Sequence, residues 1–261
     1  MSAAITGGDA SSPVATSAIE RLRGDHIPAS FGSVPSAKVF VTGNTAFYID
    51  FFEVARVYAP IVIGFVLGMS FLLLTVVFRS IVVALKSIIL NLLSVGAAYG
   101  LLVLVFQKGW VGNELLGFQQ FDTIEAYIPL FLFAVLFGLS MDYHIFLMSR
   151  IRERFDQTQD NVGSVAFGIR TTGRLITGAA LIMVAVFGGF AFAGSTVDLQ
   201  QFGFGLGVAV LLNATIVRMV LVPAAMKLLG DWNWYLPRWL NWLPDLRLEV
   251  ELAPAETASA D

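Results

Sequence analysis

The stretch Gly138–Arg150, which reads GLSMDYHIFLMSR, places an aspartate near the end of a long apolar run. Asp142 lies eight residues before Arg150, which is roughly 12 Å along a helix. A charged residue at the centre of a helix in lipid costs ~2.5–3.5 kcal/mol, and somewhat less at this depth. We therefore expect Asp142 to face protein or water, or to be protonated.

The composition indicates that the chain lies in a bilayer. Of its 261 residues 57% are hydrophobic and only 13% are charged, and the mean hydropathy is +0.77. A soluble domain of this length could not bury so much apolar surface. With no cysteine and only two distant histidines, His26 and His144, the chain offers no thiolate chemistry and no metal cluster. The net charge of −3 gives no indication of a nucleic-acid partner, and we expect no cofactor.

Five nearly uncharged stretches have about the ~20 residues that are needed to cross the hydrocarbon layer. They predict an all-α membrane protein, a bundle of five transmembrane helices within residues 57–228. The predicted spans are Val57–Phe78, Ile81–Phe106, Tyr127–Ser149, Leu175–Ser195 and Phe202–Met226.

The segments outside the bundle are more polar. Residues 1–56 predict a small α/β segment, in which Lys38–Thr42 alternate like a short strand and Gly43-Asn44 signals a turn before a helix. Gln107–Ala126 predicts an amphipathic connector at the membrane interface. Residues 229–261 predict an interfacial segment followed by a disordered tail, because the segment is rich in tryptophan. These tryptophans are Trp232, Trp234, Trp239 and Trp242.

The distribution of Lys and Arg predicts the orientation. One set of loops is basic, whereas the opposite side holds only Lys108 near the membrane besides the mixed-charge N-terminal segment. The positive-inside rule then places the C-terminus in the cytoplasm and the N-terminus outside. Moving about fifty polar residues across a membrane without a leader is unusual, so we expect this chain to be the C-terminal part of something larger. The basic loops hold Arg79, Lys86, Arg150, Arg152, Arg154, Arg170, Arg174, Lys227, Arg238 and Arg247.

Asp142 and Tyr143 are the strongest candidates for chemistry. Burial and a nearby cation act in opposite directions on a carboxyl group, so such a site can load and release a proton. The alternative is that Asp142 holds a hydrogen bond between packed helices. Arg218 lies nine residues before Lys227, roughly 13 Å from the same edge. An Asp142–Arg218 pair is therefore possible, and the alternative is that Arg218 snorkels toward the cytoplasm.

Two other polar residues are weaker candidates. Asn213 lies more than a turn deeper than Arg218. His144 points away from Asp142 on a helix and is either a relay member or a satisfied interhelical residue. Small residues in the fourth and fifth spans predict close helix packing, and Pro223 predicts a kink near the end of the last helix. These small residues are Gly188, Gly189, Gly203, Gly205 and Gly207.

The sequence does not match the catalytic motifs that we considered, and we expect no enzyme activity. The stretch Gly138–Asp142 lacks the final glycine of a nucleophile elbow. An intramembrane aspartyl protease would need a second membrane carboxylate, which none of the five spans supplies. The phosphate-binding motif of nucleotide hydrolases is also absent.

Several motifs in order resemble the MMPL (mycobacterial membrane protein large) transporters, a branch of the resistance–nodulation–division superfamily. The stretch GLSMDYHIFLMSRIRE resembles the signature of their tenth helix. The resemblance covers the chain from about Ala37 to Trp242, with VTGNTAFYID at the end of the second extracytoplasmic porter domain. The other motifs are VFRSIVVALKSIILNLLSVGAAYGLLVLVFQ, TTGRLITGAALIMVAVFGGFAF and GFGLGVAVLLNATIVRMVLVPAAMKLLGDWNWYLPRWL.

The resemblance implies a multi-pass plasma-membrane exporter of lipids or other hydrophobic molecules, driven by proton antiport. The five spans would correspond to helices eight to twelve of twelve, and residues 1–56 to the end of a porter domain. Asp142 and Tyr143 would form half of a proton relay whose other half lies on the fourth helix. That helix belongs to an N-terminal half that is either the same longer chain or a split partner. The family usually has Asp where this chain has Asn213, which puts coupling in doubt.

Two other hypotheses remain open. The chain could be a non-transporting membrane subunit or an inactive remnant that only packs against partner helices. It could also form a homo-oligomer in which Asp142 of one copy faces Tyr143 of another. Besides membrane lipids, the expected partner is a hydrophobic small-molecule or lipid substrate.

Overall fold

The fold is helical throughout the part of the chain that the structure describes. This computed structural model describes residues 12–34, 36, 38–110, 116–118, 120, 124–125, 127–240 and 242. The α-helices are α1 (Pro13–Arg21), α2 (Ile27–Phe31), α3 (Asn44–Phe78), α4 (Ile81–Leu102), α5 (Ile128–Thr158), α6 (Asn161–Ala193), α7 (Val197–Leu212) and α8 (Val222–Leu229). Between or after them lie the π-helices η1 (Leu22–His26), η2 (Val103–Gln107) and η3 (Asn213–Leu221), and the 3-10 helices η4 (Gly230–Trp234) and η5 (Arg238–Leu240).

The prediction of five membrane-crossing helices is confirmed. Five helical stretches are long and apolar enough to cross a membrane, and they contain the five predicted spans almost entirely. The helices extend beyond those spans, since α3 begins at Asn44 rather than Val57. The helices α5 and α6 likewise continue past the charged positions that bounded the prediction.

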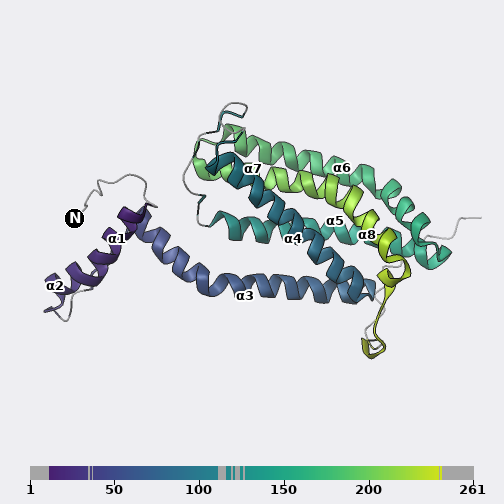
Figure 1. The fold of residues 1–261 in the computed structure, drawn as a ribbon, viewed down its shortest axis with the longest axis horizontal. Coiled ribbons are helices and arrows are strands. Elements are labelled where there is room, and N and C mark those ends of the chain that lie inside the picture. Colours follow the sequence, from purple (N-terminus) through teal and green to yellow (C-terminus); the bar gives the residue numbers. More distant parts are fainter. Residues whose placement is uncertain are drawn as a thin grey trace, which may run out of the picture.

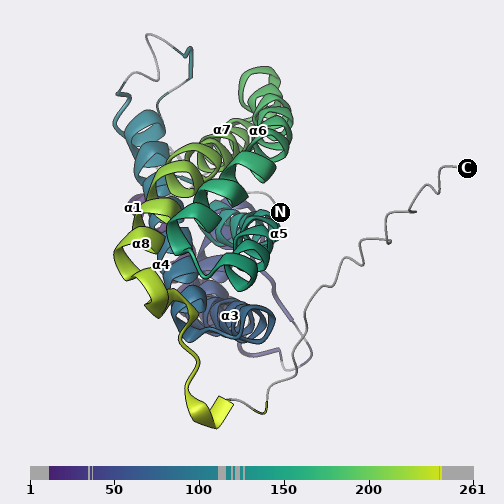
Figure 2. The same cartoon turned by 90° about the vertical axis from the view of Figure 1, so that its right-hand side faces the viewer.

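The bundle is elongated (Figure 1). The helix α3 runs along one edge and α6 along the other, with α4, α5 and α7 between them; the end view in Figure 2 shows the same order. The helices α1 and α2 lie at the far end of the molecule from α8 (Figure 1). The helix α3 bends part-way along its length (Figure 1), and Pro60 lies inside it, where the proline ring and its missing N–H disturb the helical ladder.

The predicted α/β character of the N-terminal segment is wrong. Residues 38–42 have no regular secondary structure, because a strand needs a neighbouring strand for its N–H and C=O groups and the described residues provide none. The regular structure of this segment is helical and lies earlier, in α1 and α2. Ser12 caps α1 by accepting a hydrogen bond from the Ala15 amide at 3.3 Å. The expected turn at Gly43 is confirmed by its φ of 123° directly before α3.

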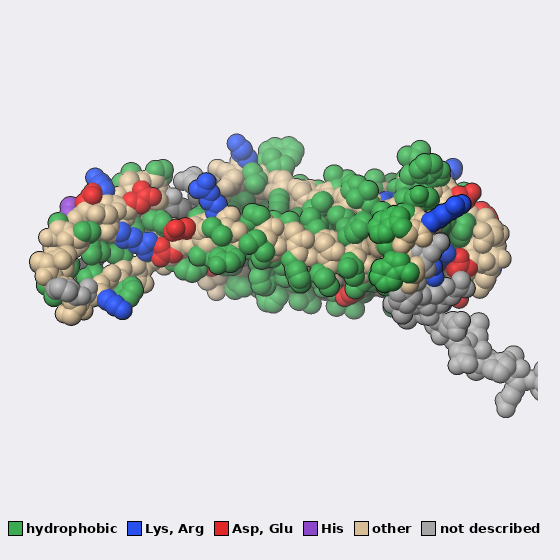
Figure 3. All heavy atoms as spheres, turned by 90° about the horizontal axis from the view of Figure 1, so that it is seen from below, with side chains coloured by type: hydrophobic (Ala, Val, Ile, Leu, Met, Phe, Trp, Pro, Cys, Tyr) green, Lys and Arg blue, Asp and Glu red, His purple; other side chains and the backbone are tan. Residues whose placement is uncertain are grey.

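Short turns at one end of the bundle make successive helices antiparallel neighbours. Arg79 joins α3 to α4 and Gln159 joins α5 to α6, both with left-handed backbone. Ser80 and Asp160 then cap α4 and α6 through side-chain bonds to Val83 and Gly163. This end carries the arginines of α5 and the first half of α6, and we call it the basic end. In Figure 3, charged side chains lie mainly toward the two ends, while the middle is largely hydrophobic.

Only part of the glycine prediction is confirmed. A Cβ on Gly203 would lie 2.5 Å from the Ala191 nitrogen, so α7 packs directly on the backbone of α6. Gly205 faces leucine side chains of α4 and α5 at similarly close range. A Cβ on Gly188 or on Gly189 would face open space, but the Gly188 nitrogen lies 3.9 Å from the Cβ position of Gly207 on α7. The close approach of this part of α6 therefore involves its backbone, while it does not depend on the missing side chains of Gly188 and Gly189.

The last predicted span is divided by η3. Its nine residues follow the π-helical pattern before α8 resumes an ordinary α-helix with Pro223 in its first turn. Proline lacks an N–H and its ring clashes with the carbonyl four residues earlier, so the wider π turn relieves both problems. A π segment thus lies just before Pro223, and the kink predicted there stays a prediction.

Asn233 ties the C-terminal segment to the basic end. Its backbone oxygen accepts from Ser80 Oγ at 2.5 Å, and its side-chain oxygen accepts from Lys86 Nζ at 3.1 Å. Its side-chain nitrogen donates to the backbone oxygens of Met226 and Gly230. The side chains of Asn233 and Lys86 are buried, so this knot of hydrogen bonds fixes η4 against α4 and α8.

Candidate functional site

Three consecutive side chains of α5 point into different surroundings. Asp142 is exposed, Tyr143 is half-buried and His144 is buried. Successive residues of an α-helix turn by about 100°, so the three side chains cannot share one face. The structure thus confirms that His144 points away from Asp142.

A buried polar cluster lies beside these residues; it consists of Asn91 on α4, Ser140 on α5, and Asn213 and Arg218 on η3. Asn213 Nδ2 donates to Ser140 Oγ at 2.5 Å and to Asn91 Oδ1 at 3.3 Å. Ser140 Oγ in turn donates to Asn91 Oδ1. The polar cluster therefore joins three helical segments in the middle of the bundle.

Arg218 is the charged member of the polar cluster. Its side chain is only 2% exposed, so it does not snorkel. Its Nε donates to Asn213 Oδ1 at 3.0 Å and its Nη2 to the Ser140 carbonyl oxygen at 2.8 Å. The guanidinium also lies 4.9 Å from the centroid of the Tyr143 ring, in the range of a cation–π contact.

The sequence allowed an Asp142–Arg218 pair, but the structure does not bring these two side chains together. Among the described residues, Asp142 and Arg218 take part in no ion pair. Arg218 approaches α5 on the side of Ser140 and Tyr143, whereas Asp142 points outward from the bundle. The acceptors of the Arg218 guanidinium are the backbone oxygen of Ser140 and the side-chain amide oxygen of Asn213, rather than a carboxylate.

The π-helix explains how Asn213 reaches Arg218. In an α-helix, residues five apart point about 140° away from each other. The i→i+5 spacing of a π-helix places them one turn apart on the same side. Asn213 begins η3 and Arg218 lies five residues on, so the segment aligns the two side chains. Such segments are frequent at functional sites.

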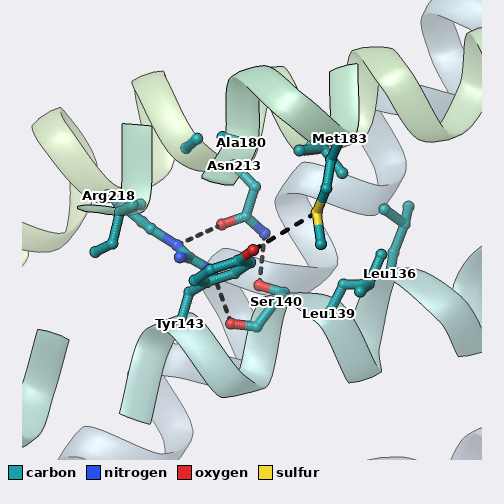
Figure 4. Close-up of a pocket in the computed structure, with 11 residues that line it drawn as sticks. Leu136, Leu139, Ser140, Tyr143, Ala180, Met183, Asn213 and Arg218 are labelled. Atoms are coloured by element: carbon teal, nitrogen blue, oxygen red, sulfur yellow. Dashed lines mark hydrogen bonds between the residues drawn. The ribbon is translucent and has the colours of Figure 1, made fainter. Parts of the chain in front are cut away.

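A small cavity lies next to the polar cluster (Figure 4). Its volume is about 20 Å³, and its polar walls are Ser140, Tyr143, Asn213 and Arg218. Tyr143 Oη donates to Met183 Sδ at 3.7 Å across it. The volume is close to what one water molecule needs, and a phenol, an amide and a guanidinium line the cavity.

His144 belongs to a separate contact. Its Nε2 lies 2.5 Å from Ser87 Oγ of α4, and both side chains are buried. The Ser87 hydroxyl lies 2.6 Å from the Val83 carbonyl of its own helix. His144 therefore links α5 to α4 and does not touch the cavity.

Asp142 lies in the middle of an exposed stripe on α5. The stripe follows the helical repeat and carries no large side chain between two phenylalanines, so a second helix could approach closely there. We define the α5 stripe as Phe131, Ala134, Gly138, Asp142 and Phe146, all of which are exposed.

Sequence reasoning missed Asn91, Ser140 and Ser87. Ser140 lies within the stretch that drew attention to Asp142, and Asn91 is a polar residue in an otherwise apolar span. Both could have been noticed as polar positions in a membrane helix, but their partners depend on helix rotation. Among the described residues, no three His, Cys, Asp or Glu side chains are grouped so that they could hold a metal ion.

Comparison with known proteins adds to this geometry. The sequence model of the MMPL family matches residues 3–243. The chain belongs to the MMPL family. It is 45% identical over 254 residues to the mycolic acid-containing lipids exporter MmpL11 of Mycolicibacterium smegmatis, which covers 97% of this chain and 26% of that protein.

Two further MMPL relatives carry different descriptions. The heme uptake protein MmpL11 of Mycobacterium tuberculosis is 49% identical over 205 residues, or 78% of this chain and 21% of that protein. The trehalose monomycolate exporter MmpL3 of Mycolicibacterium smegmatis is 37% identical over 224 residues, or 86% of this chain and 21% of that protein. The chain thus spans between about a fifth and a quarter of the length of these relatives.

Proposed function

We propose that this chain supplies the C-terminal portion of the membrane domain of a proton-driven exporter of lipids or other hydrophobic molecules. In this proposal Asp142 binds and releases the transported proton. The observation that carries the proposal is that Asp142 is the one carboxylate within the five predicted spans and yet lies exposed on α5. As a carboxylate facing lipid it would cost somewhat less than the ~2.5–3.5 kcal/mol that applies at the bilayer centre, so in this proposal a protein partner or water covers it while it is charged.

The α5 stripe is the surface where we place the remaining helices of the transporter. Two small residues beside Asp142 permit close helix approach, and the relatives are about four times as long as this chain. The partner is the rest of the same protein or a separate half. A thiol-linked photo-crosslinker attached to cysteine substituted for Gly138 in this cysteine-free chain would crosslink to that partner, whereas a crosslink to a second identical chain would favour the homo-oligomer.

Tyr143 and Arg218 have supporting roles in this proposal. The Tyr143 phenol faces the water-sized cavity, and Arg218 fixes the ring from the other side. Protonation of Asp142 removes a charge one residue away from this contact. In this proposal, loss of that charge shifts α5 relative to η3, and this movement couples proton binding to transport. Asn213 is the neutral hydrogen-bond acceptor of Arg218.

Lipids are the substrate class that we favour. Two relatives are described as exporters of mycolic acid-containing lipids and of trehalose monomycolate, both of which carry long acyl chains. We also propose that the basic end lies in the bacterial cytoplasm, because basic loops are retained on that side. The protein would then be a multi-pass plasma-membrane transporter rather than an enzyme.

The test is Asp142→Asn in the full-length transporter that contains this chain. We expect proton-driven lipid export from reconstituted vesicles to be abolished, while the amount of folded protein stays unchanged. The matched control is Asp156→Asn on the same helix, which removes a carboxylate paired with Arg152 outside the predicted span. Its export should stay near that of the unchanged protein.

Retained export in Asp142→Asn would contradict the relay. In that case the chain would be a packing subunit, and export would depend on close helix contacts such as that at Gly203 instead.

A further inference from the structure

A groove separates the ends of α5 and α6 at the basic end. Its volume is about 500 Å³, and its walls include Arg154 from α5 and Phe167 and Arg170 from α6. The Arg154 guanidinium lies 5.4 Å from the centroid of the Phe167 ring. This cation–π contact holds one arginine across the groove toward the opposite helix.

In the part of the chain that the structure describes, carboxylates pair with two other arginines of α5, but not with the two arginines of the groove. Arg150 pairs with Glu153 at 2.9 Å and Arg152 with Asp156 at 3.0 Å. Within the described ranges, neither Arg154 nor Arg170 forms an ion pair.

The other polar groups of the groove are already engaged. Asp160 lines it, but its Oδ1 accepts from the Gly163 amide at 3.1 Å as the cap of α6. The hydroxyls of Thr158 and Thr171 donate to carbonyl oxygens of their own helices at 2.9 Å each. The hydrogen-bond donors that remain for a ligand are the two guanidinium groups.

The groove opens onto a membrane-facing strip. The side of α6 that carries Arg170 continues to Arg174 and then to Leu181, at helical spacings of four and seven residues. Arg174 precedes the apolar run that begins at Leu175, and Leu181 is 70% exposed. A ligand with an anionic head and an apolar tail would therefore meet two free cations and, directly below them, an exposed apolar helix face.

We propose that this groove binds the headgroup of an anionic phospholipid, with its phosphodiester between Arg154 and Arg170 and one acyl chain along Leu181. Basic pockets between transmembrane helices bind such headgroups, and a planar guanidinium matches the geometry of phosphate oxygens. A soluble phosphate compound shares the headgroup chemistry but has no acyl chain that could contact the apolar strip. The proposal stands whether or not Asp142 carries protons.

The experiment is a lipid titration of the full-length protein in detergent, with bound lipid counted by native mass spectrometry. The probe is palmitoyl-oleoyl phosphatidylglycerol, and the neutral comparison is phosphatidylcholine with the same chains. We expect Arg154→Gln with Arg170→Gln to weaken phosphatidylglycerol binding about 25-fold, or about fivefold for each arginine. Phosphatidylcholine binding should not change.

The matched control is Arg150→Gln with Lys227→Gln, which removes the same charge from the basic end outside the groove. A loss of less than about twofold in the control supports the site, whereas an equal loss in both variants overturns it in favour of unspecific charge attraction. No loss in the groove variant also overturns it. Equal competition by the water-soluble headgroup glycerophosphoglycerol would assign the groove to soluble phosphates and overturn the lipid proposal. If the double variant does not fold, the two single variants decide by the same fivefold criterion.

Discussion

Asn213 gives Arg218 a neutral acceptor in a place where a buried guanidinium usually has a carboxylate. Hydrogen bonds between neutral side chains of membrane helices average only about 0.6 kcal/mol. A buried cation that loses an acceptor costs more, on the order of 3 kcal/mol. The contribution of the polar cluster to stability therefore comes mainly from how well it satisfies Arg218.

Asn213→Leu tests this balance at a single residue. The substitution keeps the side-chain size but removes the acceptor for Arg218 and the donor to Ser140 and Asn91. We expect the free energy of unfolding to fall by about 3 kcal/mol, measured by denaturant titration of the purified protein in detergent. The control is Thr215→Val, because the Thr215 hydroxyl donates only within its own helix; it should change stability by less than about 0.5 kcal/mol. A similar small change in Asn213→Leu would show that Arg218 finds another acceptor.

At the level of the helices, the sequence predicted where the spans lie but not how they face each other. Long apolar runs define the spans because the hydrocarbon thickness fixes their length. The five glycines looked alike in sequence, whereas helix rotation places Gly203 against a backbone and Gly188 toward open space. The alignment of Asn213 with Arg218 could not be predicted either, since it depends on a π segment that hydropathy does not reveal.

Gly203→Ala measures the close approach of α6 and α7. The added Cβ would lie 2.5 Å and 2.6 Å from backbone atoms of Ala191 and Phe187, so the helices must separate. We expect a loss of about 1–3 kcal/mol in the free energy of unfolding, seen as a lower midpoint in the same denaturant titration. Gly188→Ala should cause no loss, since nothing lies within 4 Å of its Cβ position. Equal effects of the two substitutions would mean that helix propensity, and not packing, determines the change in the free energy of unfolding.

Across the whole molecule, the C-terminal segment is fixed by distant contacts that the sequence could not predict. Its tryptophans predicted an interfacial segment, and Trp232, Trp239 and Trp242 are largely exposed in the structure. Trp234 instead stacks on Phe155 of α5, with ring centroids 4.9 Å apart. Asn233, which had no recognisable signal, joins this segment to α4 across 147 positions of sequence. Such pairings depend on tertiary structure and not on local pattern.

Asn233→Ala should loosen this end of the molecule. It removes the acceptor for the buried Lys86 ammonium and two bonds to backbone oxygens. We expect a loss of about 2–3 kcal/mol in the free energy of unfolding and faster proteolytic cleavage after η4. Asp231→Ala, an exposed change in the same segment, serves as the control and should leave both measurements unchanged. Unchanged cleavage in Asn233→Ala would show that the stacking of Trp234 alone holds the segment.

The bend in α3 divides that helix into two stretches that are not collinear. The stretch from Asn44 to Pro60 forms an arm of about 24 Å, set at an angle to the longer stretch that follows it. Arg23 links this arm to the N-terminal helices through its ion pair with Asp50. A turn of the longer stretch about its own axis would sweep the arm sideways. A rotation of the stretch after Pro60 would therefore be felt at α1 and α2 as a sideways displacement, well away from the bilayer-spanning part of α3.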